Sequence, residues 1–273
     1  MLRDFAGEAV AVAGGQSLLP GLNMRLSSPR LLVDIGELPE LAVSDFDADV
    51  IRLGALTRHV EVLESALLRE RLPLLPRAMA HVAHAAIRNR GTLGGSLAYA
   101  DPAAELPACA VALDATIIIA GVEGEREVRA EDFFTGLMQT ALAPGELIVA
   151  VRFPVAAANS RFAFGEFARR RGDFAVAGIA AAVLFERDRI ATARVVYFGC
   201  VERAKIAEGV SAACAGLALP TPDIDKVFRA VEGDLDPEDI PGWRADTQIE
   251  LAKVLTRRAL EELGGVKALH AVH

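Results

Sequence analysis

Apolar and polar positions follow two different spacings along the first 155 residues of the chain. Short apolar or alternating runs, typical of strands, predict β-structure over residues 9–13, 31–35, 50–55, 116–120, 127–129 and 147–153. Apolar residues at helical spacing predict helices over 56–70 with Thr57 as N-cap, over about 76–89 with a stop at Gly91, and over 102–112. These strands and helices do not alternate as a regular βαβ repeat.

The pattern changes after residue 154. Residues 155–160 form a small connector with a polar end, and the alternating stretch 161–171 predicts a long strand. Residues 175–200 predict a hairpin with its turn at 186–189, and two or three helices follow, the last over 245–263. Strands followed by helices indicate a separate α+β domain with a three-stranded antiparallel sheet. The expected division is therefore 1–156 and 157–273.

Composition and charge narrow the class of protein. The chain has 273 residues, of which 52% are hydrophobic, and its net charge of −8 argues against a nucleic-acid or anionic-membrane partner. No apolar run approaches the roughly 20 residues of a membrane span. No secretory signal is visible, so a cytoplasmic location is expected. Cys109, Cys200 and Cys214 are far apart and form no C-x-x-C pair, which predicts no local zinc or iron–sulfur site.

Two Gly-Gly segments carry the candidate chemistry: "AGGQS" at 13–17 and "TLGGS" at 92–96. Read as two turns of the same design, they would offer consecutive backbone N–H groups to an anion, with added hydroxyls from Ser17, Thr92 and Ser96. Two such nests facing each other would hold a diphosphate. The alternative is a pair of ordinary tight loops, and neither segment matches a usual nucleotide signature.

Longer motifs around these segments are more specific. "AGGQSLLPGLNMRL", "IRNRGTLGGSLAYADPAAELPACAVALDA", "LAPGELIVAVRFP" and "FARRRGDFAVAGIAAAV" follow one another in this order. The chain thereby resembles, over almost its whole length, the FAD-binding medium subunits of molybdenum hydroxylases of the carbon monoxide dehydrogenase and xanthine dehydrogenase type. The resemblance implies a two-lobed FAD-binding domain of the p-cresol methylhydroxylase type and a CO dehydrogenase flavoprotein-type C-terminal domain. Family members usually carry a further strand and most of a helix before the first glycine segment, so a late or truncated start is expected.

The resemblance also implies residue roles. The first diphosphate loop would comprise Ala13, Gly14, Gly15, Gln16, Ser17 and Leu18, and the second Thr92, Gly94, Gly95 and Ser96. Glu105 would bind the ribityl–flavin region, unless it is a plain helix-surface carboxylate. Asp173 and Phe174 would lie against the isoalloxazine ring, and Ile148 completes the expected cofactor-binding set. Asp101 is interpreted as an Asp-Pro turn residue.

Other charged residues near these motifs receive no assigned role. Arg169, Arg170 and Arg171 would favour a reduced, anionic flavin or an acidic partner, or else form a solvated strand end. His81 and His84 are expected on a helix surface, and no metal is assigned to them.

By the same resemblance, the chain would be a cytoplasmic oxidoreductase subunit with non-covalent FAD and no catalytic residues of its own. A molybdenum cofactor in a large partner subunit would oxidise the substrate, and 2Fe-2S clusters in a small partner would pass electrons to FAD and on to an external acceptor. Two other hypotheses stay open: a non-catalytic assembly scaffold with a lost flavin site, and a stand-alone flavin oxidase.

Overall fold

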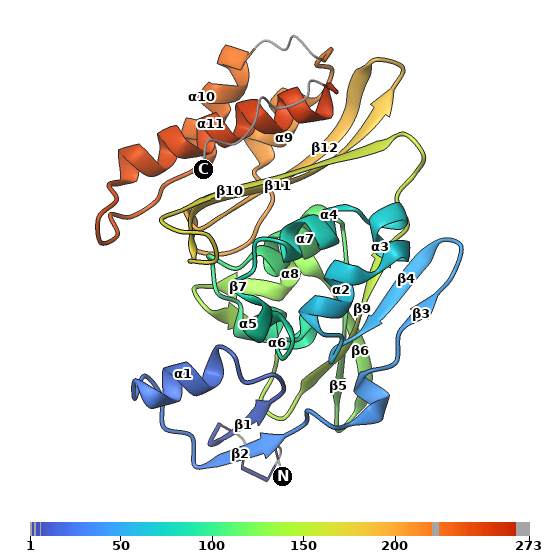
Figure 1. Cartoon of the computed structure of the whole chain (residues 1–273), viewed down its shortest axis with the longest axis vertical. Helices are drawn as coiled ribbons and strands as arrows, with labels where there is room; N and C mark the ends of the chain where they lie inside the picture. The colour runs from blue at the N-terminus through green and yellow to red at the C-terminus, as the bar shows by residue number, and fades with distance from the viewer. Residues whose placement is uncertain (1, 3, 6, 220–223, 266–273) are drawn as a thin grey trace.

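Two antiparallel sheets organise the chain in a computed structural model that describes residues 2, 4–5, 7–219 and 224–265 (Figure 1). The strands are β1 Ala9–Val12, β2 Leu31–Asp34, β3 Asp45–Phe46, β4 Val50–Gly54, β5 Thr116–Gly121, β6 Gly124–Arg129, β7 Phe134–Gly136, β8 Gln139–Thr140, β9 Leu147–Pro154, β10 Ser160–Ala168, β11 Ala175–Glu186 and β12 Arg189–Phe198. The helices are α1 Leu18–Asn23, α2 His59–Glu64, α3 Ala66–Arg71, α4 Leu74–Met79, α5 Ala85–Arg88, α6 Leu93–Tyr99, α7 Glu105–Ala112, α8 Ala130–Phe133, α9 Glu208–Cys214, α10 Ile224–Asp234 and α11 Ala245–Leu263, with a 3-10 turn at Pro39–Leu41.

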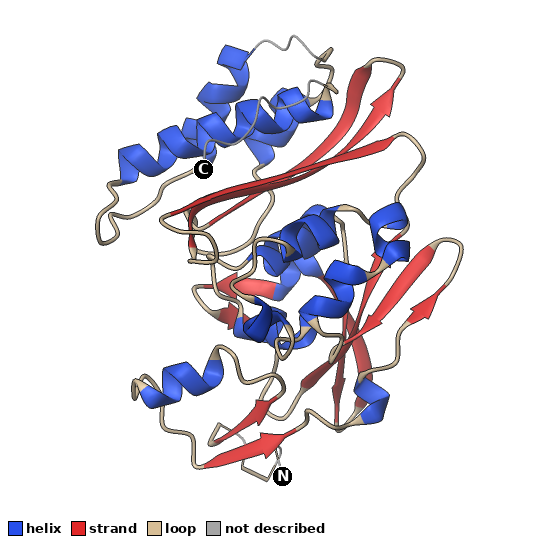
Figure 2. Cartoon of the chain, in the orientation of Figure 1, coloured by secondary structure: helices blue, strands red, loops and turns tan. Residues whose placement is uncertain are grey.

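The three-stranded sheet β10-β11-β12 is covered by helices on both faces, as Figures 1 and 2 show. Ile179 and Val183 of β11 pack into the core beneath α9, α10 and α11, whereas Ala180 belongs to the core beneath α4 and α7. Alternate residues of a strand point to opposite faces, so a strand buried on both faces is apolar at almost every position. This explains the apolar run of β11 and confirms the predicted hairpin and antiparallel sheet.

The first part of the chain is built on the five-stranded sheet β3-β4-β9-β5-β6. Helices α4, α6 and α7 pack in the same core as its inner residues, including Ile51, Ile117 and Val151. Strands β1 and β2 form a separate parallel pair with the register Ala9↔Leu31. The predicted strands are therefore confirmed, although β3, β7 and β8 were not predicted. No helix in the described residues is long and apolar enough to cross a membrane.

Two predicted helices are interrupted in the structure. The helix expected over 56–70 divides at Ser65, whose hydroxyl accepts a hydrogen bond from Leu68 N at 3.2 Å and caps α3. The first piece, α2, begins at His59 with Arg58 rather than Thr57 at the N-cap, because the Glu61 carboxylate accepts from Arg58 N at 2.6 Å. Thr57 is instead buried with its hydroxyl 3.3 Å from Ser44 Oγ.

The helix expected over 76–89 is also wrong, because α4 and α5 are separated by residues 80–84. Ala83 adopts a left-handed conformation with φ of 39°. The Arg88 side chain holds this bend by donating to Val82 O at 2.7 Å and to Ala83 O at 3.1 Å. His81 and His84 consequently lie in and beside a bend, not on a continuous helix face.

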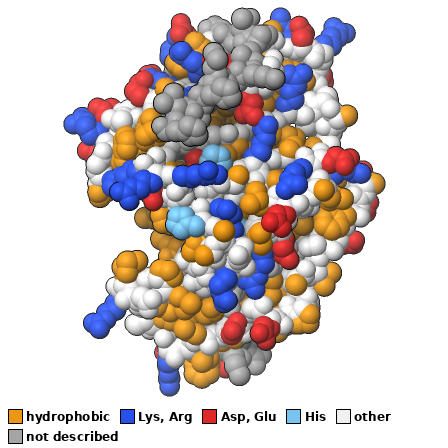
Figure 3. Space-filling view, in the orientation of Figure 1, with side chains coloured by type: hydrophobic (Ala, Val, Ile, Leu, Met, Phe, Trp, Pro, Cys, Tyr) orange, Lys and Arg blue, Asp and Glu red, His pale blue; other side chains and the backbone are white. Residues whose placement is uncertain are grey.

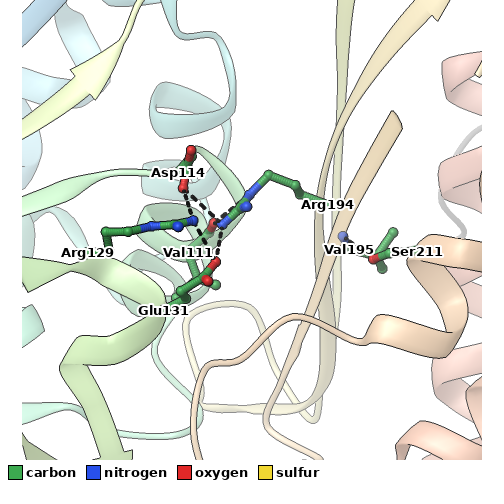
Figure 4. A network of polar contacts seen from close by, with 7 residues as sticks. All are labelled: Val111, Asp114, Arg129, Glu131, Arg194, Val195 and Ser211. Carbon is green, nitrogen blue, oxygen red and sulfur yellow. Dashed lines mark hydrogen bonds and ion pairs between the residues drawn. The ribbon is translucent and has the colours of Figure 1, made fainter. Parts of the chain in front are cut away.

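A polar network joins β12 to the first part of the chain (Figure 4). Arg194 of β12 donates to Glu131 of α8 at 2.9 Å and to Val111 O near the end of α7 at 2.9 Å, and Asp114 lies 3.3 Å away. Arg129 also contacts Asp114, at 2.9 Å. These contacts accompany a shared apolar core that includes Phe198. The two predicted parts of the chain are therefore packed together by both apolar and charged side chains.

Candidate functional site: a glycine-lined cradle

The two glycine segments meet in the structure. Gly14 packs against the backbone before the second segment so closely that an added Cβ would overlap the Arg90 carbonyl oxygen. An added Cβ at Gly95 would lie 3.9 Å from Ala13 Cβ. Gly15 has a φ of +72°, which most residues adopt only with strain. The chain thus places the end of β1 and the start of α6 side by side. This is the arrangement that the hypothesis of a diphosphate site requires.

The first segment offers free backbone donors. In the part of the chain that the structure describes, the N–H groups of residues 14–17 donate no hydrogen bond. The Gln16 side chain donates back to Gly14 O at 2.8 Å, which fixes the loop, and the exposed Ser17 carries a hydroxyl. Leu18 is the half-buried first residue of α1. Successive N–H groups around a left-handed glycine suit an anion.

The second segment has a different structure from the first, so the expectation of two similar turns is wrong. Residues 93–99 form α6, with Thr92 as its N-cap. The first four N–H groups of α6 are already accepted within the chain: Leu93 N by Thr57 O at 2.9 Å, Gly94 N by Ala55 O at 2.8 Å, Gly95 N by Thr92 Oγ1 at 3.1 Å and Ser96 N by Thr92 O at 3.0 Å. This segment therefore supplies a side-chain-free wall and the Ser96 hydroxyl, rather than a second set of open amides.

His59 holds the start of α6 in place through two contacts. Its backbone N donates to Gly91 O at 3.0 Å, and its ring Nε2 lies 3.0 Å from Thr92 O. Because a carbonyl only accepts, this geometry requires a proton on Nε2. Burial lowers the pKa of His59 to about 4, and the charges of Arg58 and Arg88 act in the same direction. Sequence reasoning did not identify this residue.

Glu105 begins α7 and is not an exposed helix-surface carboxylate, which excludes that alternative. It is half-buried, and burial raises its pKa to about 8, with the negative charges of Glu166 and Asp101 acting in the same direction. Burial also raises the pKa of Asp101. The Asp101 carboxylate accepts from Ala103 N at 2.9 Å, as expected of a turn residue. At neutral pH Glu105 therefore holds a proton and can donate a hydrogen bond.

Asp173 and Phe174 lie in the exposed turn between β10 and β11. The Phe174 side chain is 70% exposed, so it takes no part in the core of the C-terminal sheet. Gly172 brings this turn onto the bend between α4 and α5, where an added Cβ would lie 2.8 Å from Ala83 O and 3.1 Å from His84 Nδ1. The turn that bears the exposed Phe174 ring thus lies against residues 83–84 through Gly172.

The remaining candidates are buried. Ile148 is 5% exposed and belongs to the core that α6 and α7 share with β9. Burial raises the pKa of Cys109, that of Cys200 to about 12 and that of Cys214 to about 11, so the thiols stay protonated. In the described part of the chain, no three His, Cys, Asp or Glu side chains are grouped as metal ligands.

Comparison with known proteins agrees with this geometry. Residues 1–156 match the family model "FAD binding domain in molybdopterin dehydrogenase", and residues 162–263 match "CO dehydrogenase flavoprotein C-terminal domain". The chain is 38% identical to the 6-hydroxypseudooxynicotine dehydrogenase complex subunit alpha of Paenarthrobacter nicotinovorans, over 99% of this chain and 90% of that protein. It is 35% identical to the caffeine dehydrogenase subunit beta of Pseudomonas sp. strain CBB1, over 95% and 88%.

Solved structures show the same fold. Carbon monoxide dehydrogenase from Hydrogenophaga pseudoflava superposes with a TM-score of 0.92 at 31% identity, covering 97% of this chain and 92% of that chain. Quinoline 2-oxidoreductase from Pseudomonas putida 86 gives 0.86 at 37%, covering 95% and 90%. The fold, together with the cradle formed by residues 13–17 and the start of α6, defines a flavoprotein component of an oxidoreductase. The chain belongs to the family of FAD-binding medium subunits of molybdenum hydroxylases.

The residues present fit FAD. The open amides of residues 14–17 suit a diphosphate, and the side-chain-free surface at Gly95 allows it to approach α6. Arg58 and Arg90 meet at the base of α6, where the Arg58 guanidinium donates to Arg90 O. Figure 3 shows Lys, Arg and His side chains gathered across the middle of one face, despite the overall negative charge. When bound, FAD would supply the redox chemistry.

Proposed function

We propose that this chain binds one FAD non-covalently and passes electrons from 2Fe-2S clusters of a small partner subunit to an external acceptor. A molybdenum cofactor in a large partner subunit would oxidise the substrate. The observation that carries the proposal is the run of amides at residues 14–17, which donate no hydrogen bond in the described part of the chain and lie next to Gly95 of α6. A scaffold that had lost its flavin site would have no reason to keep this cradle.

The roles of individual residues follow from their positions. Gly14, Gly15, Gln16 and Ser17 would hold the diphosphate, with Thr92, Gly94, Gly95 and Ser96 lining its other side. Glu105, with its bound proton, would donate a hydrogen bond to the ribityl–flavin region. Residues 1–156 would form the FAD-binding domain and 157–273 the C-terminal domain, whose turn would bring Phe174 to the ring.

Replacing Phe174 by Ala is expected to weaken FAD binding by about 2- to 10-fold, because aromatic stacking contributes about 0.5–1.5 kcal/mol. Flavin fluorescence should rise as the quenching ring is removed. Thermal unfolding of the apoprotein should be unchanged, since the side chain is 70% exposed. Phe46→Ala, at another exposed phenylalanine in β3, is the matched control and should bind FAD normally. Equal FAD binding and fluorescence in both variants would contradict the role assigned to Phe174.

The electron-transfer role is tested by affinity purification of the tagged chain from its native host. Permanent complexes of this kind bury about 2,000 Å² or more in total, so a large molybdenum subunit and a small iron–sulfur subunit should be recovered with it. The chain alone should show no hydroxylase turnover, and the complex should. Substrate oxidation by the isolated chain would favour a stand-alone oxidase, and an active complex without flavin would favour a scaffold.

A further inference from the structure

A histidine and a buried glutamate form a pair that the sequence did not suggest. His81 lies in the bend after α4, and its Nδ1 is 3.2 Å from Oε1 of Glu166, on β10. The His81 side chain is 42% exposed, whereas that of Glu166 is 7% exposed. The His81 ring also lies 5.1 Å from that of Phe164, which supports its orientation. The pair therefore connects solvent with the interior.

The second carboxylate oxygen of Glu166, Oε2, is buried and makes no hydrogen bond within the described residues. An unpaired buried carboxylate oxygen is costly unless a donor reaches it. Its negative charge acts on Glu105, which holds a proton at neutral pH. The other titratable groups coupled to Glu105 are Asp101 and Cys109.

The bend that carries His81 is held in place from two sides. Ala83 has a φ of 39°, a conformation that costs energy for a residue with a side chain. Arg88 holds its carbonyl, and Gly172 packs on it from the turn that bears Phe174. Strained backbone of this kind clusters at functional sites. His81 is thus fixed beside the turn proposed to meet the flavin ring.

We propose that His81 and Glu166 form a proton route from solvent to Glu105, and so to the flavin site. The inference rests on the proposed function, because electrons that arrive from iron–sulfur clusters carry no protons. Full reduction of a flavin to its reduced anion consumes two electrons and one proton. The clusters supply the electrons. Solvent supplies the proton in three steps. Glu105 first gives its own proton to the flavin site and is left ionised. Glu166 then passes a proton to Glu105, Glu166 Oε1 takes one from His81 Nδ1, and solvent restores the proton on His81. Reoxidation by the acceptor removes the two electrons and this proton.

The first test measures the carboxyl groups without any flavin. Infrared spectra of the apoprotein, recorded across a pH series, should show a protonated carboxyl band that titrates near pH 8 and disappears in Glu105→Gln. Glu166→Gln removes a negative charge, so it should shift this titration to lower pH. Glu262→Gln is the matched control, because Glu262 pairs with Arg77 of α4 at 2.6 Å on the surface. An unchanged titration in Glu166→Gln would overturn the coupling.

The second test measures proton delivery in the FAD-loaded protein. Photochemical reduction in weak buffer with a pH-indicator dye follows proton uptake. Uptake should be slowed at least about tenfold in Glu166→Gln and His81→Phe, as expected for loss of a positioned proton-transfer group. Glu166→Asp should restore part of the rate, and Glu262→Gln should match wild type.

The outcomes separate the two proposals. Wild-type uptake rates in Glu166→Gln and His81→Phe, with FAD bound, would overturn the proton route and leave the FAD-binding function standing. A wild-type chain that cannot be loaded with FAD would overturn the proposed function and the delivery step together. His81→Phe keeps a ring against Phe164 at a partly exposed position, so it separates proton transfer from folding.

Discussion

Replacing Gly15 by Val is expected to lower the FAD content of the purified chain at least about tenfold, since hydrogen bonds to a charged group contribute about 1.5–3 kcal/mol each. Gly15 has a φ of +72°, and an added Cβ would lie 2.9 Å from Leu19 Cδ1. A branched side chain there would distort the loop whose amides are proposed to hold the diphosphate. Flavin absorbance per mole of protein gives the content directly.

The control for this substitution is Gly233→Val, because nothing lies within 4 Å of an added Cβ at Gly233 in α10. This variant should keep the wild-type FAD content. Thermal unfolding of both apoproteins separates loss of the cofactor from loss of the fold. If the folded Gly15→Val protein carried as much FAD as wild type, the cradle would be misplaced.

A second large effect is expected below neutral pH, where His59 should lower the free energy of unfolding. Burial lowers its pKa in the folded chain to about 4, from the ordinary histidine value of 6.5. Between these two values the unfolded chain binds a proton that the folded chain does not, so the free energy of unfolding decreases as pH falls. From pH 7 to pH 5 the loss amounts to about 2 kcal/mol, at about 1.4 kcal/mol per unit of pKa. The contribution is absent above pH 7, where His59 is neutral in both states.

Urea unfolding at several pH values measures this effect. His59→Gln keeps an N–H donor for Thr92 O but does not titrate, so its stability should fall about 2 kcal/mol less than that of wild type between pH 7 and pH 5. Glu105 and Asp101, whose pKa values are raised, contribute the opposite trend, but they are present in both proteins and cancel in the comparison. Parallel pH profiles for the two proteins would contradict the assignment of a buried, neutral His59.

The sequence predicted those strands and helices whose buried face is marked by the spacing of their own apolar residues. The β11 and β12 hairpin and α11 are found because their apolar spacing is continuous. The break at residues 80–84 was missed because it depends on Arg88 and Gly172, which approach the bend only in the folded chain. Helix α6 was missed because its two glycines have poor helix propensity. Thr92 before Leu93 and Leu97 was the N-cap signal that could have found it.

The candidate site was predictable to a similar extent. Gly14 and Gly15 stand out in the sequence because glycine serves a close backbone approach and a left-handed φ. His59 and the pair of His81 with Glu166 do not, because their partners are distant in sequence and their roles arise from burial. The sequence predicted the same role for both glycine segments. In the structure, the carbonyl groups of Thr57 and Ala55 accept hydrogen bonds from amides at the start of α6, so these amides of the second segment are not open to a ligand.

The most direct test of the account is the amount of FAD that the chain binds and how it is held. The purified chain, reconstituted with excess FAD and then desalted, should retain about one FAD per chain with the absorption spectrum of a protein-bound flavin. Acid precipitation should release all of it into the supernatant, since no His or Cys lies within residues 13–17 or 92–96 to form a covalent link. A chain that retains no flavin, or flavin that stays with the precipitated polypeptide, would contradict the central claim.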